Sequence, residues 1–355
     1  MIFLSSPHMH GGNSIQLTMF SVIIALLPAA MVSVYLYGWL AVFLLTTCIG
    51  ISLLTEYWML RWMGKPTKPV WDGSAGLTGL LLALILPAAV PWWMAIFAAV
   101  FAIMLGKQLY GGLGHNPFNP ALAARVVLLI SFPLHMTSWI VPMHMDASLD
   151  MYGFVTSLKF FFLGPEAVKQ TWDAITMASP LGYLKTELGQ GVTVSQALVN
   201  YNYSTLHAFI GREAGSLGEG SALALLMGGI WLMARHTISW HIPISFIGTV
   251  AVLAALFNLI NPDAYAPPMF HVLAGGLILC AFFMATDPVS SPSSSIGKIV
   301  FGVGCGVLTW VIRTYGNYPE GAMFAVVLMN MATPLIDYYV RPRVYGYKRG
   351  KQHEL

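Results

Sequence analysis

A short polar stretch, DAITMASPL at residues 173–181, interrupts an otherwise apolar chain. It contains an acid, Asp173, and two hydroxyl side chains, Thr176 and Ser179, with Ala178 directly before the serine. Hydroxyl side chains are potential nucleophiles. The same residues are also ordinary turn and helix-cap chemistry, because Asp-x-x-Thr and Ser-Pro are common at such boundaries. The spacing alone therefore leaves a chemical and a purely structural interpretation open.

A second candidate is the glycine- and proline-rich stretch GGLGHNPFNP at residues 111–120. Its repeated glycines and prolines prevent a helix and expose backbone donors and carbonyls. One interpretation is the lining of a redox or quinone-like pocket. The alternative is a re-entrant turn between two membrane spans.

Four charged residues form a third group, because they lie in or at the ends of apolar segments: Glu56, Arg125, Asp287 and Asp337. A charge buried in lipid is costly enough to imply a partner or a water path. The sequence favours an ion pair between Arg125 and either Asp287 or Asp337. A proton or sodium path through these residues is the alternative.

The elements that position these residues must be membrane helices. Of the 355 residues, 57% are hydrophobic and only 9% are charged, whereas soluble domains carry roughly 25% charged residues. Most of the surface must therefore face lipid. The net charge of +3 gives no reason to expect nucleic acid as a partner. Three cysteines without a C-x-x-C motif argue against protein-ligated iron–sulfur clusters and c-type haem.

A hydrocarbon core of about 30 Å needs about 20 apolar helical residues. Ten segments qualify as candidate spans: 17–38, 39–60, 75–88, 91–110, 119–139, 220–236, 243–261, 270–286, 296–314 and 320–340. The third is short and ends at Pro87, which predicts a broken or half-spanning helix. The first follows no basic region or cleavage site, so we expect it to remain as an anchor. The predicted fold class is an all-α integral membrane protein.

Basic residues predict the orientation. With a cytoplasmic N-terminus, the cytoplasmic connections and tail hold eleven basic residues: Arg61, Lys65, Lys68, Lys107, Arg235, Lys298, Arg341, Arg343, Lys348, Arg349 and Lys351. The short outer loops hold only Arg313. Both termini are then cytoplasmic, and the long loop at residues 140–219 is extracytoplasmic.

The two halves resemble each other. Ala75-Gly76 opens a span that ends at Pro87, and Ala274-Gly275 opens one that ends at Pro288. Five spans per half would make the repeat inverted, and such folds place broken helices and binding sites at the repeat interface. The predicted organisation is a first repeat (1–139), an extracytoplasmic loop (140–219), a second repeat (220–340) and a basic cytoplasmic tail (341–355).

Four stretches carry a family resemblance: KQLYGGLGHNPFNPA at Lys107–Ala121, LLISFP at Leu128–Pro133, TDP at Thr286–Pro288, and PLIDYYVRPRVYG at Pro334–Gly346. Through them the chain resembles the D subunit of the Rnf electron-transport complex over nearly its whole length. It is more distantly similar to the B subunit of the Na⁺-translocating NADH:quinone oxidoreductase.

The resemblance implies a covalent FMN, joined through its phosphate to a hydroxyl that closes the motif D-x-x-[ST]-x-A-[ST]. Asp173, Thr176, Ala178 and Ser179 fill this motif. Ser179 is then the attachment point, with Thr176 as the fallback. The sequence departs from the family in two places, because the acceptor is usually Thr and position 177, here Met177, is usually small.

Attachment in this family uses a transferase with FAD as donor: the hydroxyl attacks the pyrophosphate and AMP leaves. The reaction calls for an exposed, unhindered hydroxyl on a mobile segment. The aromatic residues Trp172 and Tyr183 flank the motif and are candidates to pack on the flavin ring.

The resemblance further implies a non-covalent riboflavin towards the cytoplasmic face and a place in the bacterial inner membrane. The chain would relay electrons between ferredoxin and NAD(H) pools, coupled to H⁺ or Na⁺ movement, and would not be catalytic alone. Expected partners are a second covalent-FMN subunit, iron–sulfur subunits, an NADH-binding subunit, the flavin transferase and membrane lipid.

Two other functions fit the sequence. An inverted repeat with a broken helix suits a channel or secondary transporter equally well, because fold alone does not determine function. A purely structural scaffold subunit is the third possibility. Neither has a need for the hydroxyl motif.

Overall fold

The structure is a computed structural model, and it describes residues 15–142, 153–164, 176–211, 213–316, 318 and 320–341. Asp173, Trp172 and most of the basic tail lie outside the described residues.

The described chain is mainly helical. The first half contains α1 (Ile15–Tyr37), α2 (Trp39–Trp62), the 3₁₀ turn η1 (Lys68–Asp72), α3 (Ser74–Ile85), α4 (Trp92–Ile103), the π-helical turn η2 (Met104–Gln108), α5 (Pro120–Ser131) and α6 (Pro133–Thr137). The connecting region contains β1 (Trp139–Ile140), α7 (Phe154–Leu163), β2 (Thr176–Met177), α9 (Pro180–Gly189), α10 (Val194–Asn200), α11 (Thr205–Ile210) and the 3₁₀ turn η5 (Leu217–Gly220). The second half contains α12 (Ala222–Ala234), α13 (His241–Ile260), α14 (Pro268–Leu273), α15 (Leu277–Leu279), the π-helical turn η6 (Cys280–Met284), α16 (Ser295–Tyr315) and α17 (Ala322–Tyr339).

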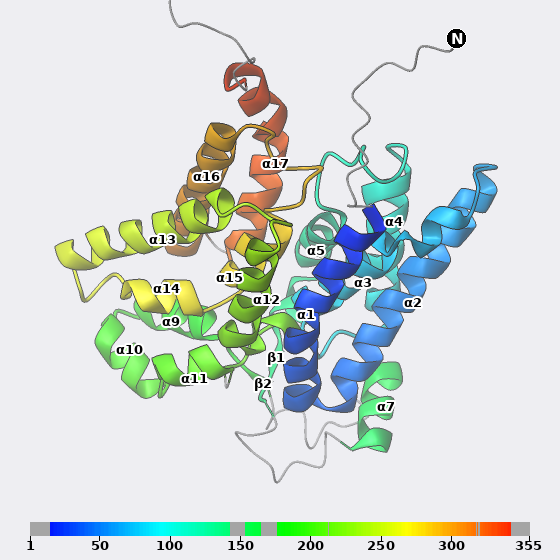
Figure 1. Cartoon of the computed structure of the whole chain (residues 1–355). Coiled ribbons are helices and arrows are strands. Elements are labelled where there is room, and N and C mark those ends of the chain that lie inside the picture. The colour runs from blue at the N-terminus through cyan, green and yellow to red at the C-terminus, as the bar shows by residue number, and fades with distance from the viewer. Residues whose placement is uncertain are drawn as a thin grey trace, which may run out of the picture.

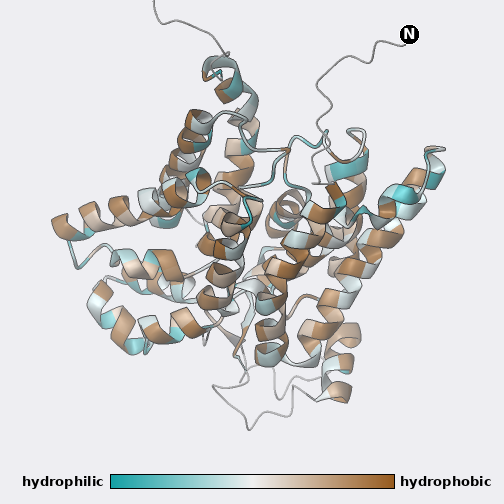
Figure 2. Ribbon diagram, viewed as in Figure 1, coloured by the Kyte–Doolittle hydropathy of each residue, from teal (hydrophilic) through white to brown (hydrophobic). Residues whose placement is uncertain are grey.

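Five of these helices are long and apolar enough to cross a membrane: α1, α2, α13, α16 and α17. Helix α3, α4 with η2, α5 and α12 are shorter and apolar. Hydrophobic residues predominate along the helices, and hydrophilic ones gather at their ends and in the connections (Figure 2). Each predicted span contains helical structure, but among the described residues only these five helices have spanning length.

Prolines and glycines account for the short helices. Helix α3 ends at Ile85, before Pro87, because the residue preceding a proline disfavours helical backbone. The predicted span 119–139 ends early, at Ser131, for the same reason before Pro133. The predicted span 270–286 is interrupted between α14 and α15, where Gly275 has a φ of 73°. Only glycine adopts this conformation readily.

Close helix packing depends on small residues, as is usual where lipid removes the hydrophobic driving force. Helix α1 packs along α12, α2 packs along α3 and α4, and α13 packs along α16. At the first contact a Cβ on Gly228 would lie 2.1 Å from the backbone oxygen of Ala25. At the second a Cβ on Gly79 would lie 2.7 Å from the backbone oxygen of Cys48.

The molecule has two distinct ends (Figure 1). We call the end where α1 begins and α17 ends the tail face. The opposite end, the loop face, carries α7, the two-stranded sheet β1–β2 and helices α9, α10 and α11. In the sheet, Trp139 pairs with Met177 and Ile140 with Thr176, in antiparallel orientation. The sheet therefore anchors the hydroxyl motif to the end of the first half.

We expect Gly228→Ala to destabilise the protein by about 1–3 kcal/mol, because the added methyl group must displace the backbone of α1. The matched control is Gly248→Ala in α13, where a Cβ meets nothing within 4 Å. Thermal unfolding in detergent compares the two. Equal midpoints for both variants would contradict the packing argument.

Candidate functional site

The main pocket lies between the two halves, near the start of α1 and the end of α12, which places it towards the tail face. It encloses about 890 Å³, its open mouth included. Its apolar walls include Val22, Leu81 and the aromatic pair Phe282 and Phe283. Polar side chains also line it: Thr78, Lys107, Asn116, Asn119 and Asp287. An apolar pocket with a few polar groups is typical of a cofactor site.

The glycine-rich stretch forms one wall of this pocket. Its glycines, Gly111, Gly112 and Gly114, all have φ between 93° and 120°, so this segment turns instead of continuing the preceding helix. Asn119 then caps α5 by accepting hydrogen bonds from the backbone of Ala121 (3.1 Å) and Leu122 (3.4 Å). The two interpretations of this sequence are therefore compatible: it is a turn, and it lines a pocket.

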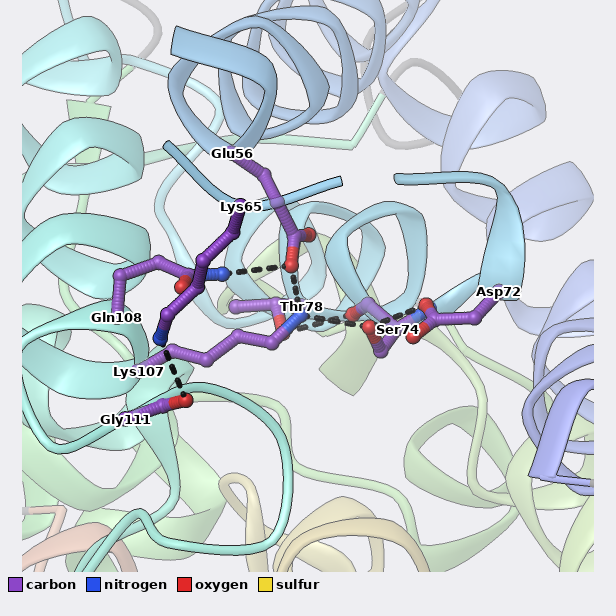
Figure 3. A network of polar contacts seen from close by, with 8 residues as sticks. All are labelled: Glu56, Lys65, Asp72, Ser74, Thr78, Lys107, Gln108 and Gly111. Carbon is purple, nitrogen blue, oxygen red and sulfur yellow. Dashed lines mark hydrogen bonds and ion pairs between the residues drawn. The ribbon is translucent and has the colours of Figure 1, made fainter. Parts of the chain in front are cut away.

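A buried polar network borders the pocket (Figure 3). The Lys107 ammonium contacts Glu56 Oε1 at 2.6 Å and donates to Ser74 Oγ at 2.6 Å. Gln108 Nε2 donates to the same Glu56 oxygen at 2.8 Å. Ser74 in turn donates to Asp72 through its backbone N–H, at 2.7 Å. Glu56 and Lys107 are only 1% and 2% exposed, so this ion pair lies in the apolar interior.

The π-helical turn η2 explains how two consecutive side chains reach one carboxylate. Lys107 and Gln108 are both buried, whereas neighbours in an α-helix point in directions about 100° apart. Such turns are frequent at functional sites. Gly106 lets η2 approach the start of α5 closely, because a Cβ there would lie 3.0 Å from Pro120.

The predicted pairing of Arg125 is wrong. Its guanidinium pairs with Glu320, directly before α17, and not with Asp287 or Asp337. Arg125 is 1% exposed and Glu320 6% exposed. The carboxylates of both aspartates instead accept hydrogen bonds from backbone N–H and hydroxyl groups. Asp287 accepts from the backbone of Val289 (3.3 Å) and the hydroxyl of Ser290 (3.1 Å).

Asp337 joins α17 to the start of α16. Its carboxylate accepts from the backbone N–H of Ser293 at 3.0 Å and from the Ser293 hydroxyl at 3.1 Å. The candidate ion path of Arg125, Asp287 and Asp337 is thus not assembled by direct contacts between these side chains.

Two basic residues differ from their predicted positions. The sequence places Lys107 in a cytoplasmic connection and Arg313 in an outer loop, yet both are buried. Lys107 is drawn inward by Glu56. Arg313 lies in the last turn of α16 and donates to the backbone oxygens of His271 and Ala274, the latter at 3.0 Å. It thereby satisfies carbonyls at the interrupted end of α14.

Ser179 is placed at the start of α9 on the loop face. Its Oγ accepts a hydrogen bond from the backbone N–H of Gly182 at 3.2 Å, as a helix N-cap. The expectation of an exposed hydroxyl differs from the structure, because the side chain is 5% exposed. Ala178 is held by the Tyr201 hydroxyl, which donates to its backbone oxygen at 3.1 Å.

The surroundings of Ser179 are partly apolar and aromatic. Tyr183 lies one turn further along α9 and packs against Tyr201, with ring centroids 5.2 Å apart. Burial lowers the pKa of Lys185 on the same helix. Burial also raises the pKa of Glu213, between α11 and η5, to about 7. The charged forms of both groups are therefore disfavoured here.

Some site residues escaped the sequence analysis. Glu320 carries no motif, and the pairing of Lys107 with Glu56 joins residues 51 positions apart. The only signal in the sequence was that charged residues in an apolar chain are costly. It indicates that they have partners but not which residues those partners are.

The fold and these sites define a multi-pass helical membrane protein with a largely apolar pocket between its halves. The chain matches the NQR2, RnfD, RnfE family over residues 2–346. It is 46% identical over 341 residues to the D subunit of the ion-translocating oxidoreductase complex of Stutzerimonas stutzeri, with 96% of this chain and 94% of the relative covered. The proteins of the same name from Halorhodospira halophila and Escherichia fergusonii are 43% and 41% identical. Coverage of this chain is 98% in both comparisons, and that of the two relatives is 96% and 98%.

The chain therefore belongs to the NQR2, RnfD, RnfE family. These relatives are named as D subunits of an ion-translocating oxidoreductase complex. This confirms the resemblance drawn from the four sequence motifs.

We expect Lys107→Met and Glu56→Gln each to destabilise the protein strongly, by about 3–5 kcal/mol, because each leaves a buried polar or charged group without its partner. The double variant should cost less than the sum, since the two residues form one interaction. Lys65→Met is the control: this exposed lysine also reaches the glycine-rich stretch, at Gly111 O (3.3 Å). Unfolding in detergent measures all four, and strictly additive effects would show that the pair is not coupled.

Proposed function

We propose that this subunit relays electrons through two flavins, an FMN esterified to Ser179 on the loop face and a riboflavin in the pocket towards the tail face. The observation that carries the proposal is the placement of these two sites at opposite ends of one helical bundle. Flavins supply one- and two-electron transfer when bound.

Ser179 suits a phosphate ester for two reasons. An N-cap oxygen lies at a helix N-terminus, where backbone N–H groups and the helix dipole favour an anion. Gly182 also keeps the space beside the hydroxyl open, because a Cβ there would lie 3.2 Å from Ser179 Oγ. Since the hydroxyl is 5% exposed, the transferase must act before the start of α9 packs, or during its local opening.

The pocket suits an uncharged flavin. Leu81, Phe282 and Phe283 offer apolar and aromatic surface for a ring system. Asn116, Asn119 and Asp287 offer amide and carboxylate groups for ring edges and for a hydroxylated chain. The pocket contains one cation, Lys107, and Glu56 neutralises it. The site therefore favours riboflavin over a phosphorylated flavin.

The finer parts of the proposal follow from the family resemblance. The complex would couple ferredoxin and NAD(H) redox to H⁺ or Na⁺ movement, with iron–sulfur, NADH-binding and second FMN-bearing subunits as partners. Ten spans in two inverted repeats would place the tail face in the cytoplasm and the loop face outside the bacterial inner membrane. A channel or transporter without redox cofactors is the competing function.

We expect Ser179→Ala to abolish covalent flavin, because it removes the hydroxyl oxygen to which the phosphate is proposed to be esterified. The measurement is ultraviolet fluorescence of the denatured subunit on a gel, together with peptide mapping, using protein from a host that has the transferase. Thr176→Ala is the control and should keep its flavin. A fluorescent band that survives in Ser179→Ala would show that the flavin is attached to another residue. Absence of a band in the wild type would favour the transporter.

We expect Val22→Trp to remove the non-covalent flavin by filling the pocket, while covalent flavin stays. Ile24→Trp is the matched control on the same helix, because Ile24 is 50% exposed and faces away from the core. Flavin released by acid denaturation is quantified by chromatography. Equal release from both variants would place riboflavin outside this pocket.

A further inference from the structure

A second buried charge cluster lies on the loop-face side of the bundle, away from the pocket. Its centre is the ion pair of Arg125 in α5 with Glu320, which precedes α17. Glu219 in η5 and Arg313 in α16 act electrostatically on Glu320 as well. The thiol of Cys280 in η6 experiences all four charges. Two cations and two anions thus meet where the interrupted helices come together.

The polar atoms of this cluster are incompletely satisfied. Among the described residues, Arg125 Nε and Nη1, Glu320 Oε1 and Glu219 Oε1 are buried and have no hydrogen-bond partner. Buried polar groups normally have partners, and orphaned ones indicate water or an exchangeable ion. Structural pairing alone therefore does not account for this cluster.

A narrow cavity lies beside the pair. Both Arg125 and Glu320 line it, and it has room for about one water molecule. Tyr318 and Trp139 form further walls, and Thr137, an exposed residue, lies at its edge. A water molecule that enters this cavity lies beside Glu320.

The cluster also borders the segment that carries Ser179. Trp139 of the cavity wall pairs in the sheet with Met177, two residues before Ser179. On the other side, Leu181, two residues after it, meets Gly275: a Cβ on that glycine would lie 2.8 Å from Leu181 Cδ1 and 3.1 Å from Arg313 Nη2. Residues on both sides of Ser179 therefore contact the elements that hold the cluster.

We propose that Glu320 is a proton-exchange group whose protonation follows the charge of the cofactor on Ser179, a step that rests on the function proposed above. With both glutamates ionised, the two arginines and two glutamates are neutral together. Added negative charge nearby favours the protonated form of a carboxylate. Glu320 then takes one proton from cavity water and leaves the cluster with one net positive charge. When the negative charge departs, the proton returns to water.

The groups that face Glu320 favour this role over a fixed ion pair. Arg125 and Arg313 stabilise its anion, Glu219 opposes it, and Cys280 and Tyr318 lie alongside. Because these charges act on the Glu320 carboxylate in opposite directions, a nearby change of charge can alter its protonation. In this proposal Glu320 contacts no cofactor atom. Its role is to exchange a proton with water.

The direct test uses N,N′-dicyclohexylcarbodiimide, which reacts with protonated carboxyl groups in apolar surroundings. The assembled complex is labelled at one pH with its flavins oxidised or reduced by dithionite, and Glu320 is located by peptide mass spectrometry. We expect severalfold more labelling of Glu320 in the reduced complex, and no such difference in Ser179→Ala. Equal labelling in both redox states, or the same difference in Ser179→Ala, would overturn the inference.

A second measurement follows the potential of the covalent flavin. In Glu320→Gln its midpoint potential should depend less on pH than in the wild type. Glu187→Gln, which removes a carboxylate from α9 itself, should keep the wild-type dependence. An unchanged dependence in Glu320→Gln would overturn the inference. Absence of covalent flavin, seen independently by intact mass, would instead count against the function proposed for Ser179.

Discussion

Charge buried in an apolar helical bundle is the constraint on which the rest of this structure depends. In the part of the chain that the structure describes, two buried ion pairs limit this cost, Lys107 with Glu56 and Arg125 with Glu320. Removing an ion from water costs several kcal/mol, which only a close partner and further hydrogen bonds offset. The first pair joins α2 to the π-helical turn beside the pocket. The second joins α5 to the residues that precede α17.

The same constraint applies to the backbone where helices are interrupted, because its polar groups also need partners there. Non-helical backbone at membrane depth is tolerated only where protein or water satisfies its polar groups. Arg313 performs this task at the end of α14, by donating to the carbonyls of His271 and Ala274. At the end of α3, the backbone N–H of Leu217 donates to Leu86 O at 3.2 Å. Each break is therefore closed by an element from elsewhere in the chain.

The sequence predicts the helices well because their causes are local. Apolar length fixes where they run, and Pro87, Pro133 and Gly275 fix where three of them end or break. The glycine-rich stretch was recognisable for the same reason. The partners of buried charges were not predictable, because Glu56 and Lys107, or Arg125 and Glu320, meet only after distant helices pack. Burial of Ser179 likewise depends on how α9 and α10 fold against the bundle, which no local pattern specifies.

The central claim is that the chain carries two flavins at opposite ends. Its most direct test is the flavin content of the subunit isolated from its native host, by intact mass and by analysis of the flavin released on denaturation. The account predicts one FMN in phosphoester linkage and one riboflavin per chain. A subunit of unmodified mass that releases no flavin would contradict it.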